Sequence, residues 1–472
     1  MARRDWSEKR DDLMQPSLSP ELTPRIVVDQ PVALYDAPLS IALEGFAPRT
    51  RVTVTATFQV AEATPWRSWA AFIADDGGRV DVTRQAPVAG TWEGVSPMGL
   101  FWSATPVPGK WRPAPPDWVM WSSVARLHAE APGAAPAELT VERRLAGAGV
   151  SRRLVREAGV VGTLFLPPGD GPHRAVIVLG GSDGGISEHR AALVASHGYA
   201  ALSLAYFGTT DLPSELVNAP VEYFGHAVSW MREQPWLQDG FLAVWGVSRG
   251  GELALLLGAT IPTINAVIAY VASGVLHGPF EPHDPPDTPP CWTSRGQPLP
   301  YLQEHNATDD PTSVDYTKSP VAESPRYLSQ LRDVNAVERA TIPVERTHGP
   351  ILLVSGQDDQ IWPSSILAEI AIRRLQQHGH TYPFRHLSYE GAGHAIYIPY
   401  SPTTQIEYGH PNSVHYTGGG SPRANAEAGI DAWRHVLAFL EESAGSVGEP
   451  SNSPVQRTGA RVARPPAADR RR

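Results

Sequence analysis

The sequence predicts an α/β fold with a doubly wound, mostly parallel sheet, preceded by an all-β domain. From about residue 150, apolar strand-like runs alternate with helix-like segments, a rhythm typical of parallel sheets with right-handed crossovers. Residues 23–145 instead carry short alternating runs separated by turn signals such as ADDGG and PVAG, with no helical period. Many short strands at such spacing favour an immunoglobulin-like β-sandwich.

Composition divides the chain further. We expect a flexible arm over residues 1–20, the sandwich over 21–145, the α/β domain over 146–444 and a disordered basic tail over 445–472. The tail holds six arginines against two acids among many Pro, Ser and Gly residues, which is typical of a solubilising end. Within the α/β domain, residues 276–345 are rich in Pro, Asp and Thr, and we interpret them as a lid or insertion.

Each alternating run in the first half of the chain predicts one strand. The tryptophans of this half are expected to anchor the core or the domain interface rather than to form a ligand cage. The strands are RIVV (25–28), SIALEGF (40–46), RVTVTATFQV (51–60), WRSWAAFIAD (66–75) and GRVDVT (78–83), and the tryptophans are Trp66, Trp69, Trp92 and Trp102.

In the second half, eight strands are expected, the first of them a short edge strand: 152–157, 159–167, 174–180, 201–206, 241–246, 265–272, 349–356 and 384–390. The expected helices are 187–197, one with Val221, Phe224, Val228 and Met231 on a single face, 250–259, 364–378 and about 423–442.

Bulk properties exclude several classes of function. A net charge of −10 argues against a general nucleic-acid binder. A single cysteine, Cys291, expected in a loop, excludes an internal disulfide framework and a multi-cysteine metal site. Scattered His and Asp residues form no metal-ligand pattern, and no cofactor is expected. The charged start and the lack of an apolar run of ~18–20 residues predict no signal peptide, no membrane span and a cytoplasmic protein.

The pattern G-x-S-x-G occurs twice, in GGSDGG (180–185) and GVSRGGE (246–252). In the α/β-hydrolase arrangement the nucleophilic serine follows the fifth strand, which selects Ser248. Gly246 and Gly250 flank it where a side chain would clash across a tight turn. Ser182 follows the third strand, where a loop supplies a backbone N–H of the oxyanion hole, from Gly181 or Ser182. The second N–H is expected from Arg249.

The base and the acid should follow the last two strands. His394 lies in EGAGHAIY, directly after the final strand, between small residues. In SGQDDQIWP the expected partner of the imidazole is Asp359, with Asp358 as the alternative. The chain order Ser, Asp, His is that of the α/β-hydrolases. Glu252 is interpreted as structural, and the Arg249 side chain as either a contact for an anionic substrate or a surface residue.

These motifs extend into a wider resemblance. The chain resembles the acyl-CoA thioesterase / bile-acid-CoA:amino-acid N-acyltransferase family in GVSRGGELAL (246–255), IPVERTHGPILLVSGQDDQIWPS (342–364), the GH pair at 393–394, WRSWAAFIADDGGRVDVT (66–83) and PVAGTWEGVSPMGLFWS (87–103). The resemblance covers about residues 25–440 and implies a Ser248–Asp359–His394 triad acting on acyl-CoA-like thioesters. Family acyltransferases usually carry Cys at the elbow, so Ser here favours water as the acceptor.

Other functions stay open at this stage. A serine acyl-enzyme can also meet an amine, which would make the protein an acyltransferase. The same scaffold serves ester, lactone or peptide hydrolases, and a binding module with a vestigial triad is a third reading. Coenzyme A should be met by basic residues, for which the candidates are Arg326, Arg332, Lys110 and Arg112.

Overall fold

The computed structural model describes residues 23–59, 65–108, 117–280, 288–303 and 314–445. The predicted flexible arm, all of the predicted tail except Gly445, and the candidate residues Lys110 and Arg112 lie outside these ranges.

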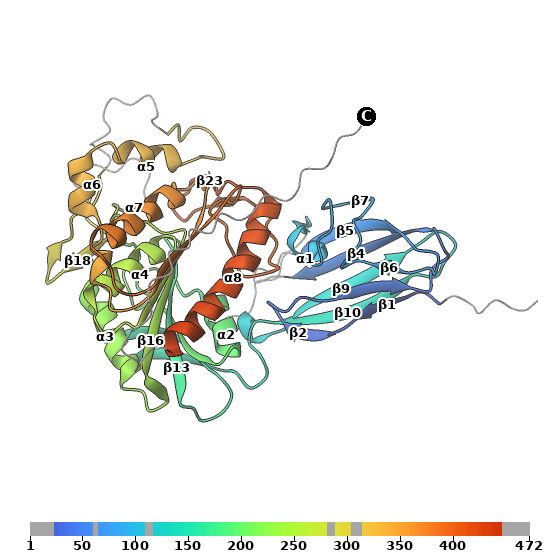
Figure 1. The fold of residues 1–472 in the computed structure, drawn as a ribbon, viewed down its shortest axis with the longest axis horizontal. Helices are drawn as coiled ribbons and strands as arrows, with labels where there is room; N and C mark the ends of the chain where they lie inside the picture. The colour runs from blue at the N-terminus through green and yellow to red at the C-terminus, as the bar shows by residue number, and fades with distance from the viewer. Residues whose placement is uncertain (1–22, 60–64, 109–116, 281–287, 304–313, 446–472) are drawn as a thin grey trace, which may run out of the picture.

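The first half of the described chain consists of two sheets that share one apolar core (Figure 1). A three-stranded sheet has the order β1-β3-β6 and a seven-stranded sheet the order β2-β10-β9-β4-β5-β7, with β8 paired to β5. Along β4, buried and partly exposed residues alternate as the sequence predicted. The strands are β1 Arg25–Val28, β2 Val32–Leu34, β3 Ile41–Glu44, β4 Arg51–Gln59, β5 Pro65–Ile73, β6 Val80–Asp81, β7 Ala89–Gly90, β8 Thr105–Pro106, β9 Ser123–Glu130 and β10 Ala137–Arg144.

Short helices, α1 Gly99–Trp102 and η1 Trp118–Met120, lie between these strands. Trp92 and Trp102 are buried in the sandwich core, and Trp66 packs against it. The expectation for Trp69 is wrong, because its side chain is 39% exposed. Trp69 lies on the outer face of β5, because successive side chains of a strand point to opposite faces and its own points away from the core.

The second half is built on an eight-stranded sheet of order β11-β12-β14-β13-β16-β17-β20-β21 (Figure 1). Only β12 runs antiparallel to its neighbours, and β11 is the predicted edge strand. The strands are β11 Ser151–Glu157, β12 Val160–Leu166, β13 His173–Leu179, β14 Tyr199–Leu204, β16 Leu237–Val247, β17 Ala266–Tyr270, β20 Ile351–Gly356 and β21 Phe384–Tyr389. The predicted doubly wound, mostly parallel sheet is therefore confirmed.

Helices cover both faces of this sheet. On one face α2 (Glu188–Ser196) and α8 (Pro422–Gly445) pack in one apolar cluster. On the other face α3 (Val221–Arg232), α4 (Arg249–Thr260) and α7 (Ser364–Gln377) pack in a second cluster. Both faces being covered explains why the central strands are continuous apolar runs.

Two segments of the second half carry small elements of their own. The described part of 276–345 contains β18 Trp292–Ser294, β19 Gln297–Pro298, α5 Ser324–Gln330, α6 Val334–Ala340 and η3 Val344–Arg346, and β18 also pairs with β15 Ala219–Pro220. Between β21 and α8 lies a hairpin of β22 (Glu407–Gly409) and β23 (His415–Thr417), which the sequence analysis did not predict.

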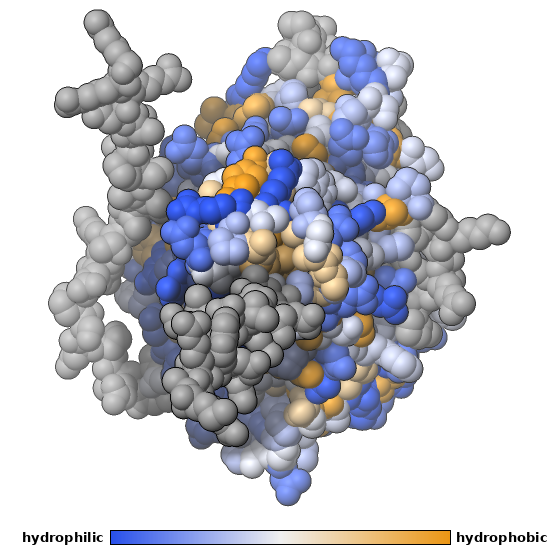
Figure 2. Space-filling model, turned by 90° about the vertical axis from the view of Figure 1, so that its right-hand side faces the viewer, coloured by the Kyte–Doolittle hydropathy of each residue, from blue (hydrophilic) through white to orange (hydrophobic). Residues whose placement is uncertain are grey.

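Polar contacts tie the sandwich to the α/β half. Oδ2 of Asp36 accepts hydrogen bonds from His197 Nε2 at 2.6 Å and Trp433 Nε1 at 2.7 Å. The guanidinium of Arg143, only 2% exposed, donates to the carbonyl of Tyr400. Figure 2, which faces the sandwich end, shows apolar residues in separate patches among hydrophilic ones. Among the described residues, no helix combines the length and the apolar character that crossing a membrane requires.

Candidate active site

Ser248 sits on a strained turn between β16 and α4. Its backbone has φ 57° and ψ −121°, a conformation that a non-glycine residue rarely adopts. A Cβ on Gly246 would lie 1.8 Å from the carbonyl oxygen of Gly250 across the turn. A Cβ on Gly250 would instead meet the carbonyl oxygen of Gly180 at 2.1 Å. Both glycines are therefore needed, the first for the turn and the second for the neighbouring loop.

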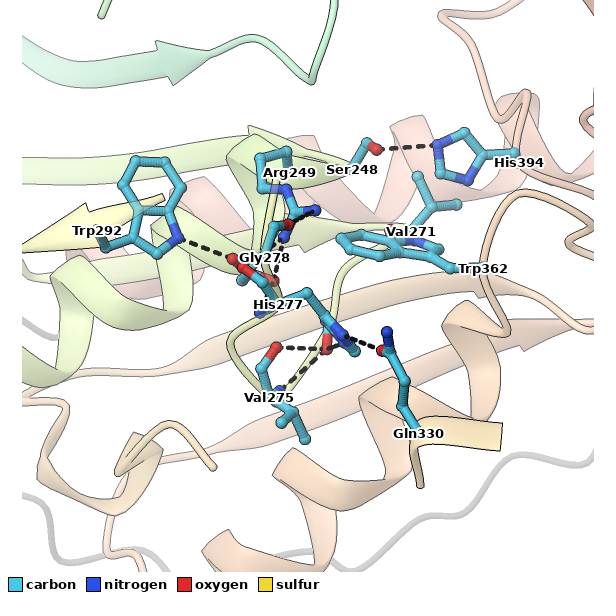
Figure 3. Close-up of polar contacts among 12 residues, drawn as sticks. Ser248, Arg249, Val271, Val275, His277, Gly278, Trp292, Gln330, Trp362 and His394 are labelled. Carbon is cyan, nitrogen blue, oxygen red and sulfur yellow. Dashed lines mark hydrogen bonds and ion pairs between the residues drawn. The ribbon is translucent and has the colours of Figure 1, made fainter. Parts of the chain in front are cut away.

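Ser248, His394 and Asp359 form one hydrogen-bonded line. The Oγ of Ser248 lies 3.0 Å from Nε2 of His394, the contact drawn in Figure 3, and Nδ1 of His394 lies 2.8 Å from Oδ2 of Asp359. The other carboxylate oxygen of Asp359 accepts the backbone N–H groups of Ile361 and Trp362 at 3.0 and 3.3 Å. An acceptor fixed in this way favours a proton on Nδ1, which leaves Nε2 free to accept from the serine.

The sheet brings these three residues together. β16, β20 and β21 run parallel, and Ser248, Asp359 and His394 each follow one of them. Residues that follow parallel strands meet at the same edge of the sheet. Asp358 points elsewhere: its carboxylate accepts the backbone N–H of Gly420 at 3.2 Å.

The loop 180–185 lies against the turn that carries Ser248. A Cβ built on Gly181 would be 3.4 Å from Cβ of Ser248 and 3.8 Å from its Oγ. The backbone of Gly181 therefore reaches the serine. Arg249 is the first residue of α4, so its N–H has no partner within the helix. The Oγ of Ser182 is engaged at a separate point, 3.2 Å from Nε2 of His410 on the β22–β23 hairpin.

The side chain of Arg249 fits neither reading that the sequence left open. It is 2% exposed and pairs with Glu252 at 2.9 Å. Its guanidinium also donates to the carbonyls of His277 and Gly278 at 3.4 and 2.9 Å (Figure 3). An arginine whose donors are used inside the protein is neither a surface residue nor placed to meet an anionic substrate.

Glu252 is structural, as predicted. Its carboxylate is completely buried and accepts from Nε1 of Trp292 at 2.8 Å and from the N–H of His277 at 3.3 Å. Burial raises the pKa of this carboxyl, and the charge of Arg249 opposes the shift. Because His277 and Trp292 belong to the segment 276–345, the buried ion pair fastens that segment to α4, the helix that follows Ser248.

His277 extends this network away from the sheet. Its Nε2 lies 3.0 Å from Oγ of Ser273 and its Nδ1 lies 3.2 Å from Oε1 of Gln330 (Figure 3). Burial, followed by the charge of Arg249, holds the pKa of His277 well below its usual value, so the ring is neutral at pH 7. The sequence offered no signal for His277 or Trp292, because they reach Glu252 only through the fold.

Cys291 and Arg326, two further residues considered from the sequence, are buried in other parts of the fold. Cys291 is buried, 1% exposed, in the core cluster of the α3 face. Arg326 is 5% exposed and pairs with Glu323 at 2.8 Å in the interior, so the expectation that it could meet coenzyme A is wrong. Among the described residues there is no group of three or more His, Cys, Asp or Glu side chains that could hold a metal ion.

A sheet of this order, with a serine on a strained turn after its fifth strand, defines the protein as an enzyme of the α/β-hydrolase fold. Residues 219–446 match the family described as BAAT / Acyl-CoA thioester hydrolase C terminal, and residues 36–157 match its counterpart, the Acyl-CoA thioester hydrolase/BAAT N-terminal region. The chain belongs to this acyl-CoA thioester hydrolase/BAAT family.

Relatives with a named activity align with most of the chain. It is 33% identical to peroxisomal succinyl-coenzyme A thioesterase of Mus musculus over 87% of this chain and 94% of the relative. It is 32% identical to mitochondrial acyl-coenzyme A thioesterase 2 of Mus musculus, over 87% of each. It is also 32% identical to acyl-coenzyme A thioesterase 6 of Homo sapiens, over 86% of this chain and 94% of that protein.

Proposed function

We propose that the protein hydrolyses acyl-CoA thioesters through a covalent acyl-enzyme on Ser248, with His394 as general base and Asp359 as the residue that orients it. The observation that carries the proposal is the hydrogen-bonded line, 3.0 Å from Ser248 Oγ to His394 Nε2 and 2.8 Å from His394 Nδ1 to Asp359 Oδ2. A serine hydroxyl is a weak nucleophile until a base takes its proton, and this geometry supplies such a base.

The reaction runs in two halves. His394 takes the Ser248 proton while Oγ attacks the thioester carbonyl, and backbone N–H groups of Arg249 and of the 181–182 loop receive the negative charge on the carbonyl oxygen. The C–S bond breaks, and the imidazolium gives its proton to the leaving thiolate. Water, deprotonated by His394, then attacks the acyl-enzyme; the bond from the acyl carbon to Oγ breaks, the imidazolium returns its proton to Oγ of Ser248, and the acid is released. Each oxyanion contact contributes about 2.7–4 kcal/mol to the transition state.

The acceptor distinguishes the two candidate activities. The matched family includes acyltransferases by its description, and an amine could replace water in the second half-reaction. Serine rather than cysteine at position 248 favours water. Turnover of one acyl-CoA with and without glycine or taurine tests this choice: free acid as the only product supports hydrolysis, and an N-acyl amino acid supports transfer. Comparing that acyl-CoA with the matching simple ester separates a thioesterase from a general ester hydrolase.

The decisive test of the proposed function is Ser248→Ala. We expect thiol release from acyl-CoA to fall by about 10⁴-fold or more, together with loss of covalent labelling by a fluorophosphonate probe. Ser182→Ala should keep the label, which identifies the serine that reacts. Ser229→Ala, on the exposed side of α3, should keep both turnover and labelling. Near-normal turnover by Ser248→Ala on thioesters and esters would refute the proposal.

Two broader assignments accompany this function. We propose that residues 21–145 and 146–444 are separate domains, because each half has its own sheets and apolar clusters. A cytoplasmic location stays a prediction from the sequence; two of the relatives are named for the peroxisome and the mitochondrion.

A further inference from the structure

We propose that His410 is a positioning residue for the oxyanion loop, residues 180–185: by donating a hydrogen bond to Ser182 it holds the backbone N–H groups of that loop against Ser248. The inference rests on the proposed function, because it concerns the loop that would receive the oxyanion. It adds a residue from the β22–β23 hairpin, distant in sequence from both G-x-S-x-G motifs.

The direction of the hydrogen bond follows from the second nitrogen of the ring. The backbone N–H of Asn412 donates to Nδ1 of His410 at 3.2 Å, so Nδ1 is an acceptor and the neutral ring carries its proton on Nε2. Nε2 faces Oγ of Ser182 at 3.2 Å and the carboxylate of Asp183 at 3.7 Å. His410 therefore donates to the hydroxyl of Ser182.

The ring of His410 is held firmly enough to act as a fixed point. The residue is 8% exposed, and its ring makes an edge contact with Phe280 at a centroid distance of 4.9 Å and with Tyr416 at 6.1 Å. The amide of Asn412 donates to the carbonyl of Phe280 and to the hydroxyl of Tyr416, each at 3.0 Å. The hairpin tip is thus anchored on the segment 276–345.

The oxyanion loop needs such outside support because four of its six residues are glycines, which leave the backbone free to adopt many conformations. Its first part is held by Tyr206, whose hydroxyl donates to the carbonyls of Gly180 and Gly181 at 2.7 and 3.4 Å. Burial raises the pKa of Tyr206, so this hydroxyl keeps its proton. A trans peptide points its N–H opposite to its carbonyl, so fixing the carbonyls also orients the N–H groups of Gly181 and Ser182.

The same hairpin reaches the rest of the site. The carbonyl of Gly418, at its end, accepts the backbone N–H of His394 at 2.8 Å, and Gly419 forms a β-bridge with Asp359. One hairpin therefore touches the loop, the base and the acid. Among its residues, His410 is the one that reaches the loop by a side-chain hydrogen bond in the described structure.

The test is a double-mutant cycle on the full-length enzyme, with p-nitrophenyl butyrate as a probe that carries no coenzyme A. His410→Phe keeps an aromatic ring but removes the hydrogen-bond donor. We expect kcat to fall about tenfold or more, with KM changed less than about twofold. This loss in kcat is smaller than the loss caused by deleting an oxyanion donor itself. His410→Gln, whose amide can donate from a place similar to Nε2, should recover most of kcat. His410→Phe combined with Ser182→Ala should be no slower than the slower single variant.

The opposing results are equally definite. Unchanged kcat in His410→Phe, or losses that multiply in the double variant, would overturn the proposal, because a purely structural histidine would act independently of Ser182. If His410→Phe does not fold, His410→Gln and Ser182→Ala test the proposal instead. A wild-type kcat in Ser182→Ala would overturn the proposal. Fluorophosphonate labelling of Ser248 in the wild type separates this failure from failure of Ser248 as the proposed nucleophile, which would abolish labelling.

Discussion

Two adjacent aspartates bind different partners: Oδ2 of Asp359 lies 2.8 Å from Nδ1 of His394, whereas Asp358 accepts the backbone N–H of Gly420 at 3.2 Å. The side chain of Asp359 is completely buried, and two further N–H groups fix its second oxygen. Asp358 is therefore a matched control for the proposed role of Asp359 as the acid that orients His394.

Asp359→Asn should lower kcat about 10⁴-fold with little change in KM, because an amide that donates to Nδ1 stabilises the wrong tautomer of His394. Asp358→Asn keeps an acceptor for Gly420 and should change kcat less than about threefold. Steady-state kinetics on one acyl-CoA, with folding checked by circular dichroism, measures both. Equal losses in the two variants would show that the carboxylate of Asp359 has no special role.

Gly250→Ala should destabilise the fold and reduce turnover together. Its Cβ would lie 2.1 Å from the carbonyl oxygen of Gly180, so either the nucleophile turn or the oxyanion loop must move. We expect a loss of about 2–4 kcal/mol in the free energy of unfolding. Gly225→Ala, on α3 with nothing within 4 Å of its Cβ, should instead stabilise by about 0.5–1 kcal/mol. Urea denaturation measures both, and a neutral Gly250→Ala would contradict the packing.

Stability should depend on pH through His277. Burial and Arg249 hold the pKa of His277 well below its usual value in the folded protein, while the unfolded chain binds a proton near pH ~6.5. The contribution of His277 to the free energy of unfolding is therefore complete above about pH 6.5. It falls as the pH decreases, by about 1.4 kcal/mol per pH unit.

His277→Gln removes this titration and should flatten the pH dependence of the free energy of unfolding between about pH 6.5 and 5. Other buried histidines with lowered pKa, such as His380, leave a residual slope. Chemical denaturation at several pH values gives both slopes. Identical slopes for the variant and the wild type would mean that folding does not lower the pKa of His277.

Asp36→Asn should weaken the contact between the sandwich and the α/β half. Asp36 holds His197 and Trp433 through one buried oxygen, and we expect a loss of about 1–3 kcal/mol. Asp76→Asn is the control, because the Arg49–Asp76 pair is 71% and 80% exposed and such pairs contribute about 1 kcal/mol at most. Thermal unfolding of the two variants checks the difference; equal melting temperatures would contradict the role of Asp36.

Much of the site was predictable because its parts obey local rules. The glycines around Ser248 are demanded by a tight turn, and the apolar runs that precede Ser248 and Asp359 are largely buried parallel strands. The strand that precedes His394 is a partly exposed edge strand. The order of the parallel strands then places the carboxyl ends of these strands at one edge of the sheet. The preference for Asp359 over Asp358 came from its spacing after the strand, and the structure turns the two carboxylates in different directions.

The unpredicted parts depend on contacts between segments far apart in the chain. Each strand of the β22–β23 hairpin has 3 residues, which is too short for a periodic signal to mark it. Arg249 could be read as a surface or substrate-binding residue because its partners, His277 and Gly278, come from a segment with no regular pattern. Trp69 lies in a strand like its buried neighbours, and only the packing of the sheet decides which face is exposed.

The sequence by itself determined the strand–helix alternation, the tight turn at Ser248 and the chain order of Ser248, Asp359 and His394, because backbone sterics and apolar periodicity act over a few residues. Tertiary structure alone decided that Arg249 is buried on Glu252 and that His410 reaches Ser182. Those contacts arise when separate segments exclude water from a shared interior, where buried polar groups must find partners, and such partners are chosen by position in space rather than by distance along the chain.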